Sequence, residues 1–287
     1  MTDETVSRRA FFRTAAIGSF VQGQMKAQTR LAVARRPAEW SYDSAKTYKD
    51  PFNEIELDVV FTDPMGTQQR VPAFWAGNQS WCVRYSPHLP GRYTYHTVCS
   101  DGSNPDLHDR SGTLEVAPYQ GTNLLYQRGP IRVAADRRHF EHADGTPFFW
   151  LGDTNWMGLC KRLHWPGEFQ SLAADRVGKG FTVVQIVAGL YPDMPPFDTR
   201  GANEGGYPWE KDYTRINPAY FNMADLRIQH LAERGLVPCI VGCWGYFLPI
   251  MGIPKMKQHW RYLIPYFRSY RAYESLGCSC ASISIGV

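Results

Sequence analysis

Residues 148–156 read FFWLGDTNW, an apolar run that stops at Gly152. A carboxylate, an amide and an indole follow at once, on Asp153, Asn155 and Trp156. A buried strand that ends in such groups is typical of a (β/α) barrel, whose C-terminal face carries the active site. The stretch therefore predicts a parallel strand that presents polar and aromatic side chains to a site.

The same pattern returns twice further along the chain. Residues 181–189 (FTVVQIVAG) and 237–245 (VPCIVGCWG) read as buried strands, and stretches of helical periodicity separate them. This alternation predicts βαβ repetition with buried parallel strands. A long insertion at 190–216, rich in Pro, Gly and Tyr, interrupts it, and loops of this length are usually functional or mobile. The helices are expected at 168–179, 217–235 and 254–274, with a kink at Pro265.

Residues 38–117 differ from the rest of the chain in their residue pattern. They form short alternating segments joined by turns of Pro, Gly and Asp, which predicts a small antiparallel sandwich of immunoglobulin-like type. A linker and a hairpin arm are expected at 118–137, and Asp144-Gly145 predicts a tight hairpin turn. The sandwich strands are expected at 54–61, 70–75, 80–85, 92–99 and 112–117, with an edge strand within 42–52.

The N-terminal segment 1–37 carries Arg8-Arg9, then Phe11-Phe12 and a mildly apolar stretch. This pattern resembles a twin-arginine export signal, and it predicts a periplasmic or extracellular protein. The alternative is a disordered basic tail. The apolar stretch is too short to cross a bilayer permanently, so no stable membrane anchor is expected.

Composition narrows the function classes. The net charge of +4 comes from scattered basic residues, which argues against nucleic acid as a partner. The abundant aromatic residues can stack on sugar faces or fill a core. The sequence has no CxxC, HExxH, phosphate-binding loop or GxSxG motif, so no metal and no cofactor is expected. Export would permit a disulfide, and Cys82 and Cys99 lie in the same predicted domain.

Two segments resemble known domains. Residues 40–116 resemble the immunoglobulin-like domain found ahead of certain bacterial glycoside hydrolases. Residues 138–270 resemble the apiosidase-like glycoside hydrolase family, which implies a (β/α)₈ barrel. The resemblance also implies hydrolysis by two carboxylates that flank the glycosidic bond, acting on plant-type polysaccharide or its side chains. The markers are Asn53, VPAFW at 71–75, WCVRYSP at 81–87 and PGRYTY at 90–95 in the first segment, and PFFWLGDTNW at 147–156, Gly180-Phe181, Gln185 and 235–245 in the second.

The family pattern places the two carboxylates on later strands than those found here. Residues 138–287 number 150, whereas a whole barrel takes ~250. No acidic residue follows Glu274, and 275–287 is rich in Ser and Cys, as an aberrant tail would be. We therefore expect 138–274 to be the N-terminal half of a barrel, with the catalytic pair outside this chain. The open strand edges of such a half predict poor solubility, and the alternative function is an inactive fragment or a carbohydrate-binding protein.

The candidate substrate-binding residues lie within the three predicted strands, at their ends or just after them. Asp153 could instead form a loop salt bridge, and Gln185 could tie neighbouring strands together. The aromatic candidates could equally pack beneath a helix, and polar residues of the insertion, such as Asp193 and Asp212, could be solvated. The sugar, the linkage and the stereochemical outcome stay open. The candidates are Asp153, Asn155, Trp156, Gln185, Tyr191, Trp244 and Tyr246, with Trp209 as a further aromatic of the insertion.

Overall fold

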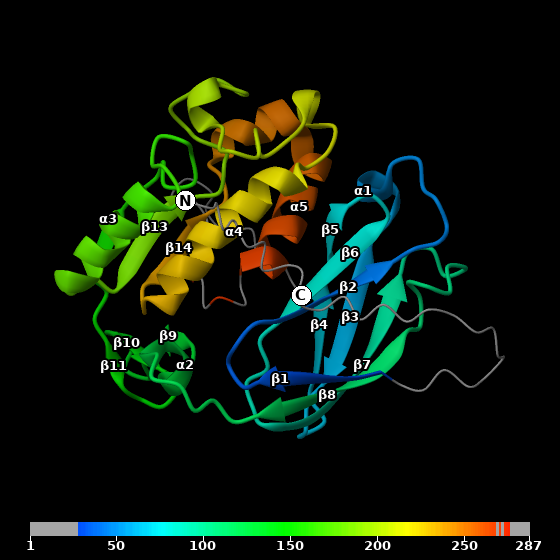
Figure 1. Cartoon of the computed structure of the whole chain (residues 1–287), viewed down its shortest axis with the longest axis horizontal. Coiled ribbons are helices and arrows are strands. Elements are labelled where there is room, and N and C mark those ends of the chain that lie inside the picture. Colours follow the sequence, from blue (N-terminus) through cyan, green and yellow to red (C-terminus); the bar gives the residue numbers. More distant parts are fainter. Residues whose placement is uncertain (1–27, 268–269, 271–272, 276–287) are drawn as a thin grey trace, which may run out of the picture.

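The computed structural model describes residues 28–267, 270 and 273–275. Its N-terminal part consists of two β-sheets that pack face to face (Figure 1). Phe61 of the larger sheet stacks on Tyr85 of the smaller one, with ring centroids 4.0 Å apart, and Trp40 meets Phe61 edge-on at 5.8 Å. The larger sheet has the order β1 (Gln28–Val33), β8 (Ser111–Ala117), β7 (Gly91–Cys99), β3 (Leu57–Thr62), β4 (Gln68–Pro72), and the smaller has β2 (Ala38–Asp43), β6 (Ser80–Tyr85), β5 (Phe74–Gly77).

The chain changes sheet at Ala73. The sequence predicted one strand at 70–75, but β4 ends at Pro72 and β5 begins at Phe74 in the other sheet. The backbone N–H of Ala73 still donates to Leu57 O at 2.8 Å, so the crossover stays attached to β3. The predicted strand at 80–85 is confirmed as β6.

Two expectations near the N-terminus differ from the structure. The edge strand expected within 42–52 is wrong in extent, because β2 ends at Asp43 and Pro51 begins the short helix α1 (Pro51–Glu54). Proline suits this first helical position, where its missing N–H costs nothing. Residues 28–33, expected to precede the sandwich as signal or disordered chain, form β1, which pairs with β8 in parallel. The twin-arginine pattern itself lies outside the described residues.

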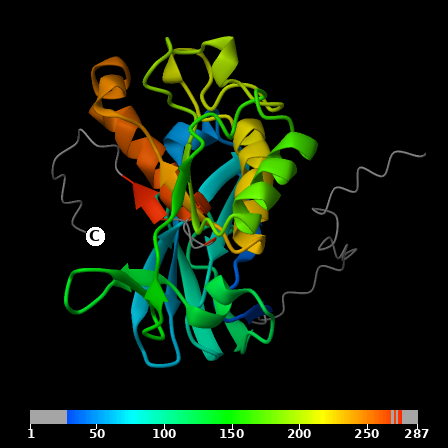
Figure 2. The ribbon, with the colours of Figure 1, turned by 90° about the vertical axis from the view of Figure 1, so that its left-hand side faces the viewer.

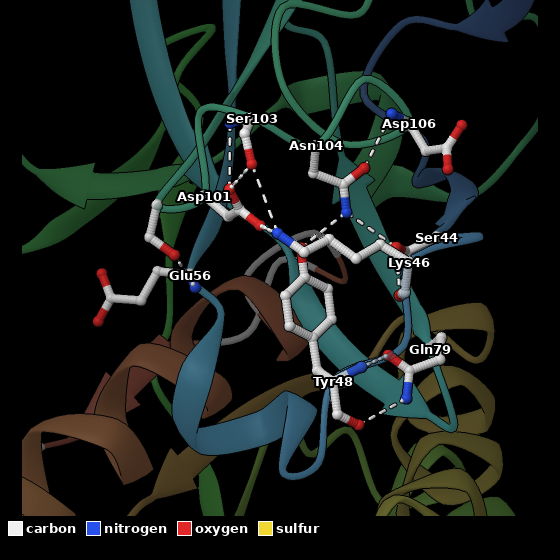
Figure 3. A network of polar contacts seen from close by, with 10 residues as sticks. Ser44, Lys46, Tyr48, Glu56, Gln79, Asp101, Ser103, Asn104 and Asp106 are labelled. Atoms are coloured by element: carbon white, nitrogen blue, oxygen red, sulfur yellow. Dashed lines mark hydrogen bonds and ion pairs between the residues drawn. The ribbon is translucent and has the colours of Figure 1, made fainter.

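Loops at one end of the two sheets are joined by a polar network (Figure 3). Asn104 is fully buried, and its amide donates to Ser44 Oγ and to Tyr48 Oη, both at 2.8 Å. Asp101 accepts from Tyr48 Oη at 2.7 Å and pairs with Lys46. Hydrogen bonds from Lys46, and further ones from Ser103 and Tyr48, hold the pKa of Asp101 well below its usual range. The network joins the loop after β2 to the loop after β7.

The linker contains a short helix and a small sheet. Helix α2 (Leu124–Arg128) is capped by Asn123, whose side chain accepts from Leu125 N at 3.0 Å. The predicted turn at Asp144-Gly145 is confirmed between β10 and β11, where Gly145 has φ 86°. The small sheet has the order β11 (Pro147–Phe148), β10 (Phe140–His142), β9 (Ile131–Val133).

The stretch FFWLGDTNW is therefore divided between two sheets. Phe148 ends β11, whereas β12 (Gly152–Thr154) belongs to a parallel sheet. Trp150, between them, packs on Phe140 at a centroid distance of 5.4 Å, which holds this turn of the chain against the small sheet. The single strand expected at 148–156 is wrong in extent, although its position in the parallel sheet is correct.

In the described part of the chain, the parallel sheet has the order β12, β13 (Val183–Val187), β14 (Val237–Val241), β15 (Tyr273–Ser275). Helices α3 (Gly167–Gly178), α4 (Pro218–Glu233) and α5 (Leu248–Phe267) follow the first three strands in turn, so the predicted βαβ repetition is confirmed. The helix expected to reach residue 274 is wrong at its end, since α5 stops at Phe267. Its backbone break lies at Gly252, with φ 76°, rather than at Pro265.

Helix α5 lies between the parallel sheet and the two-sheet part (Figure 1). Phe74 of β5 packs on Tyr266 of α5 with ring centroids 4.4 Å apart. Arg261 of the same helix reaches Asp58 of β3 at 2.5 Å. One cluster of buried apolar side chains runs from Ala34 to Tyr270 and includes residues of both parts. The two parts therefore share a core.

Candidate functional site

Three predicted residues meet at the C-terminal edge of the parallel sheet. Trp156 follows β12 and Trp244 follows β14, and their rings lie 5.2 Å apart at 63°, edge to face. The indole N–H of Trp156 donates to Gln185 Oε1 at 3.2 Å. Trp156 keeps 38% of its surface exposed, so this aromatic pair is open to solvent. An aromatic pair beside an amide can both stack and hydrogen-bond a ligand.

Gln185 reaches this edge because side chains alternate along β13. Val184 and Ile186 are buried in the cluster that contains Phe169 of α3 and Phe221 of α4, on the helix-covered face. Gln185 faces the other way, in register with Thr154 of β12 and Cys239 of β14. Burial raises the pKa of the Cys239 thiol to about 11, which keeps it protonated at neutral pH.

Asp153 does not join this group. It pairs in register with Val184, and its carboxylate accepts from Arg176 Nε of α3 at 2.7 Å. Its side chain therefore lies on the helix-covered face, opposite to Gln185. The prediction that Asp153 points into the site is wrong in this respect, and the salt-bridge alternative describes what the structure shows.

The contacts of Asn155 are with the neighbouring strand and turn. Its N–H donates to Gln185 O at 2.8 Å, which extends the pairing between β12 and β13. A side chain on Gly158 would lie 2.9 Å from Asn155 Nδ2, so the two are closely packed. Asn155 thus shapes the turn from which Trp156 projects.

Tyr191 is buried beneath the edge. Only 2% of it is exposed, and its hydroxyl accepts from Cys160 Sγ at 2.8 Å. Tyr191 packs in a small cluster with Val187, with Trp244 against its margin. Burial raises the pKa of this phenol well above its usual value. Tyr191 therefore supports the aromatic pair from below.

The insertion 190–216 folds over the same end of the sheet and contains the turns η2 (Thr199–Gly201) and η3 (Lys211–Tyr213). It is the yellow-green segment at the top of Figures 1 and 2. A shallow hollow there is lined mainly by apolar side chains from the segments after β13 and β14, Phe197 and Phe247 among them. Asp198 also lines it, but its carboxylate is held by Arg200 at 2.7 Å. Asp193 and Asp212 are exposed.

Trp209, the further aromatic candidate of the insertion, is buried, at 1% exposure, and does not line the hollow. Its indole N–H donates to Nδ1 of His259 at 3.2 Å. His259 is the residue that sequence reasoning missed. A lone histidine within a helix gives no local signal of a partner 50 positions away.

Tyr246 lies in the turn η4 (Gly245–Phe247) after β14 and is 63% exposed. Apolar side chains of the first turns of α5 are exposed beside it in sequence, namely Leu248, Ile250 and Ile253. Tyr246 therefore projects into solvent beyond the aromatic pair.

Several carboxylates around this edge are committed to ion pairs. Besides Asp153 and Asp198, Glu204 of the insertion pairs with the fully buried Arg227 of α4 at 2.8 Å. Within the described residues there is no group of three or more His, Cys, Asp or Glu side chains that could hold a metal ion. Cys82 and Cys99 are not joined by a disulfide. None of the helices in the described ranges is long and apolar enough to cross a bilayer.

Comparison with protein families agrees with this architecture. Residues 134–274 match the model of the apiosidase-like catalytic domain. This segment belongs to the apiosidase-like family. All seven candidate residues lie within the apiosidase-like segment. Residues 36–100 match a domain of unknown function, DUF5060.

A solved structure shares the fold of both parts. It is a candidate glycoside hydrolase from Bacteroides vulgatus ATCC 8482, with a TM-score of 0.65 and 22% identity over 86% of this chain and 49% of that one. The chain thus spans about half the length of that relative. A family 5 glycoside hydrolase from the same organism matches with a TM-score of 0.44 and 22% identity, over 54% of this chain and 34% of that one. No curated protein matches the chain.

Proposed function

We propose that this chain is part of a glycoside hydrolase and binds an oligosaccharide at the edge formed by Trp156, Gln185 and Trp244. The observation that carries the proposal is the exposed aromatic pair, hydrogen-bonded to an amide, at the C-terminal edge of an apiosidase-like sheet. Sugar rings present apolar faces that stack on indoles, and their hydroxyls bond amides. Tyr246 would extend this platform outward.

The proposed reaction is acid/base hydrolysis of plant-type polysaccharide or its side chains, with no cofactor. One carboxyl group protonates the leaving oxygen, while the other attacks the anomeric carbon or activates water. The C-terminal ends of β12, β13 and β14 carry amide and aromatic side chains, and Asp153 faces the helices. We therefore assign the two acids to other strands of a (β/α)₈ barrel of which this sheet is one part.

The remaining proposals concern the rest of the chain. The two packed sheets of the N-terminal part are consistent with an immunoglobulin-like sandwich that packs against α5 of the barrel. Export through a twin-arginine signal would bring the protein to extracellular polysaccharide. Detection of the processed chain in the periplasm or medium, and its retention when Arg8 and Arg9 are both replaced by Lys, would test this.

The alternative is carbohydrate binding without hydrolysis. It is favoured by the commitment of Asp153, Asp198 and Glu204 to arginine partners, because an ion-paired carboxylate is a poor general acid. The aromatic pair needs no carboxylate to hold a sugar. Both hypotheses therefore place the sugar at the same edge, and they differ in whether other strands of the barrel supply two acids for hydrolysis.

Tryptophan fluorescence during titration with pectic oligosaccharides tests the shared edge, and release of product from aryl glycosides and the same oligosaccharides tests turnover. Trp156→Ala should weaken binding roughly tenfold, equivalent to about 1.4 kcal/mol. Phe149→Ala is the matched control, since Phe149 is 75% exposed and precedes β12 at the opposite edge. Quenching without turnover is expected from both hypotheses, because the two acids are assigned to other strands; turnover by this chain would refute that assignment. Absence of both, or equal loss in both variants, would refute the proposed edge.

A further inference from the structure

His259 lies at a junction of three segments that are distant in sequence. It is fully buried in α5. Its Nδ1 faces the indole N–H of Trp209 at 3.2 Å, and its Nε2 faces the carbonyl oxygen of Gly242 at 3.0 Å. The imidazole therefore connects α5 to the insertion on one side and to the exit of β14 on the other.

The two contacts fix the state of the ring. An indole N–H can only donate, so Nδ1 must accept, and a carbonyl can only accept, so Nε2 must carry the proton. The imidazole is therefore neutral, with both nitrogens satisfied. A second proton would set two N–H groups against each other at Trp209 and break that bond.

Gly242 is held from two directions. His259 bonds its carbonyl oxygen, and the ring of Trp260 covers its α-carbon so closely that a Cβ there would lie 2.4 Å away. Trp244 follows two residues later and makes the edge-to-face contact with Trp156. The position of Gly242 thus sets the position of the backbone that carries Trp244.

Trp209 anchors the base of the insertion. It forms an isolated bridge with Ile216, which closes this end of the loop on itself. Its ring also meets Phe52 of α1 edge-on at 5.6 Å, and the ammonium of Lys255 lies 5.9 Å from its centre. Loss of the hydrogen bond to His259 would free Trp209 from α5 but leave its contacts with Phe52 and Lys255.

We propose that His259 is a positioning residue, which holds the insertion and the β14 exit together so that Trp244 meets Trp156. The role in ligand binding rests on the proposed function, whereas the positioning itself does not. The neighbouring charged groups are bonded elsewhere: Lys255 to Asn53 at 2.7 Å, Arg261 to Asp58, and Glu210 to Arg215, while Cys243 next to Gly242 contacts Met256.

Two conservative variants separate the two bonds. In His259→Asn the side-chain oxygen can occupy the place of Nδ1 and accept from Trp209, but nothing reaches Gly242. In His259→Gln the amide nitrogen can take the place of Nε2 and donate to Gly242. Trp209→Phe keeps the ring and removes only the indole donor, so it provides a test if either histidine variant folds poorly. His230→Asn, a partly buried histidine on α4, is the control.

Hydrogen exchange followed by mass spectrometry is the readout, in peptides covering 203–217 and 241–247. His259→Asn should speed exchange in 241–247, and His259→Gln or Trp209→Phe in 203–217, each by roughly tenfold or more. His230→Asn should change neither peptide. Identical patterns in the two His259 variants, or wild-type exchange in both, would overturn the proposal.

Oligosaccharide titration of the same variants separates this inference from the proposed function. Segment-specific exchange together with weaker binding in His259→Asn supports both. The same exchange pattern in a protein that binds no sugar supports the positioning role and refutes the proposed function. Unchanged exchange in a protein that does bind sugar refutes the positioning role alone.

Discussion

Arg84 of β6 and Asp225 of α4 form a two-pronged ion pair across 141 positions of sequence, with nitrogen–oxygen distances of 2.8 and 3.0 Å. The same guanidinium bonds Glu39 of β2 through Nε at 2.7 Å and lies over the ring of Tyr266. Its side chain is 2% exposed. The pair therefore lies in the shared core, at the contact between the two-sheet part and the helices.

Arg84→Ala should destabilise the protein by roughly 3 kcal/mol, because it leaves the largely buried Asp225 carboxylate without its arginine partner. Urea denaturation of both proteins measures this. Arg92→Ala is the matched control, since Arg92 is 68% exposed and its pair with Glu115 is solvated. That control should change stability by less than about 1 kcal/mol. Equal effects of the two substitutions would contradict the role of Arg84.

Acid should weaken the protein through His259. Burial lowers the pKa of this imidazole from 6.5 to about 4, so the unfolded chain takes up a proton in a range where the folded one does not. Its contribution is complete above pH 6.5 and is lost as the pH falls toward 4, for a total of about 3 kcal/mol. Unfolding free energies at pH 7 and pH 4.5 should show this loss in the wild type and less of it in His259→Gln. The same pH dependence in both proteins would exclude His259 as its source.

Gly242→Ala should cost about 1–3 kcal/mol, because the new methyl group meets the Trp260 ring. Trp260→Leu in the same chain should recover part of that loss, so the two changes will not add. Gly178→Ala is the control: it ends α3, and a Cβ there has no neighbour within 4 Å. Thermal melts compare the wild type, the single variants Gly242→Ala and Trp260→Leu, the double variant and the Gly178→Ala control. Additive losses would show that the ring and the glycine do not interact.

Asp153 and Gln185 should respond differently to substitution. Asp153→Asn weakens a partly exposed pair with Arg176 and should cost less than about 1 kcal/mol, with no change in oligosaccharide affinity. Gln185→Leu removes the acceptor of the Trp156 indole and should lower affinity roughly tenfold. The fluorescence titration distinguishes them. A loss of affinity in Asp153→Asn alone would reverse the assignment of faces.

The contrast between Asp153 and Gln185 also marks how far the sequence could predict the site. The apolar-to-polar change at Gly152 locates the end of a strand, and the structure confirms that Trp156 and Trp244 meet there. Which face Asp153 takes depends on its register with Val184, and β12 is too short and too mixed in character to reveal it. Three residues, one of them a glycine, are too few to show the alternation of apolar and polar side chains that this inference needs.

Other differences have similar causes. The segment 70–75 is divided into two strands at Ala73 because the chain crosses there from one sheet to the other. The local pattern of residues gives no sign of this crossing. The strand at Tyr273–Ser275 is only three residues long and follows a strongly periodic helix, so the local pattern does not distinguish it from the helix. The junction at His259 joins Trp209, Gly242 and α5 through contacts between distant positions, and no local spacing encodes them.

Because the buried apolar cluster passes through α5 into both parts of the molecule, the two parts share their main interior. A polypeptide cut near residue 118 would leave Phe74 and Arg84 facing water where Tyr266 and Asp225 now stand. Heating should accordingly melt both parts in a single cooperative transition. A substitution that destabilises the two N-terminal sheets should therefore also destabilise the edge that carries Trp156 and Trp244.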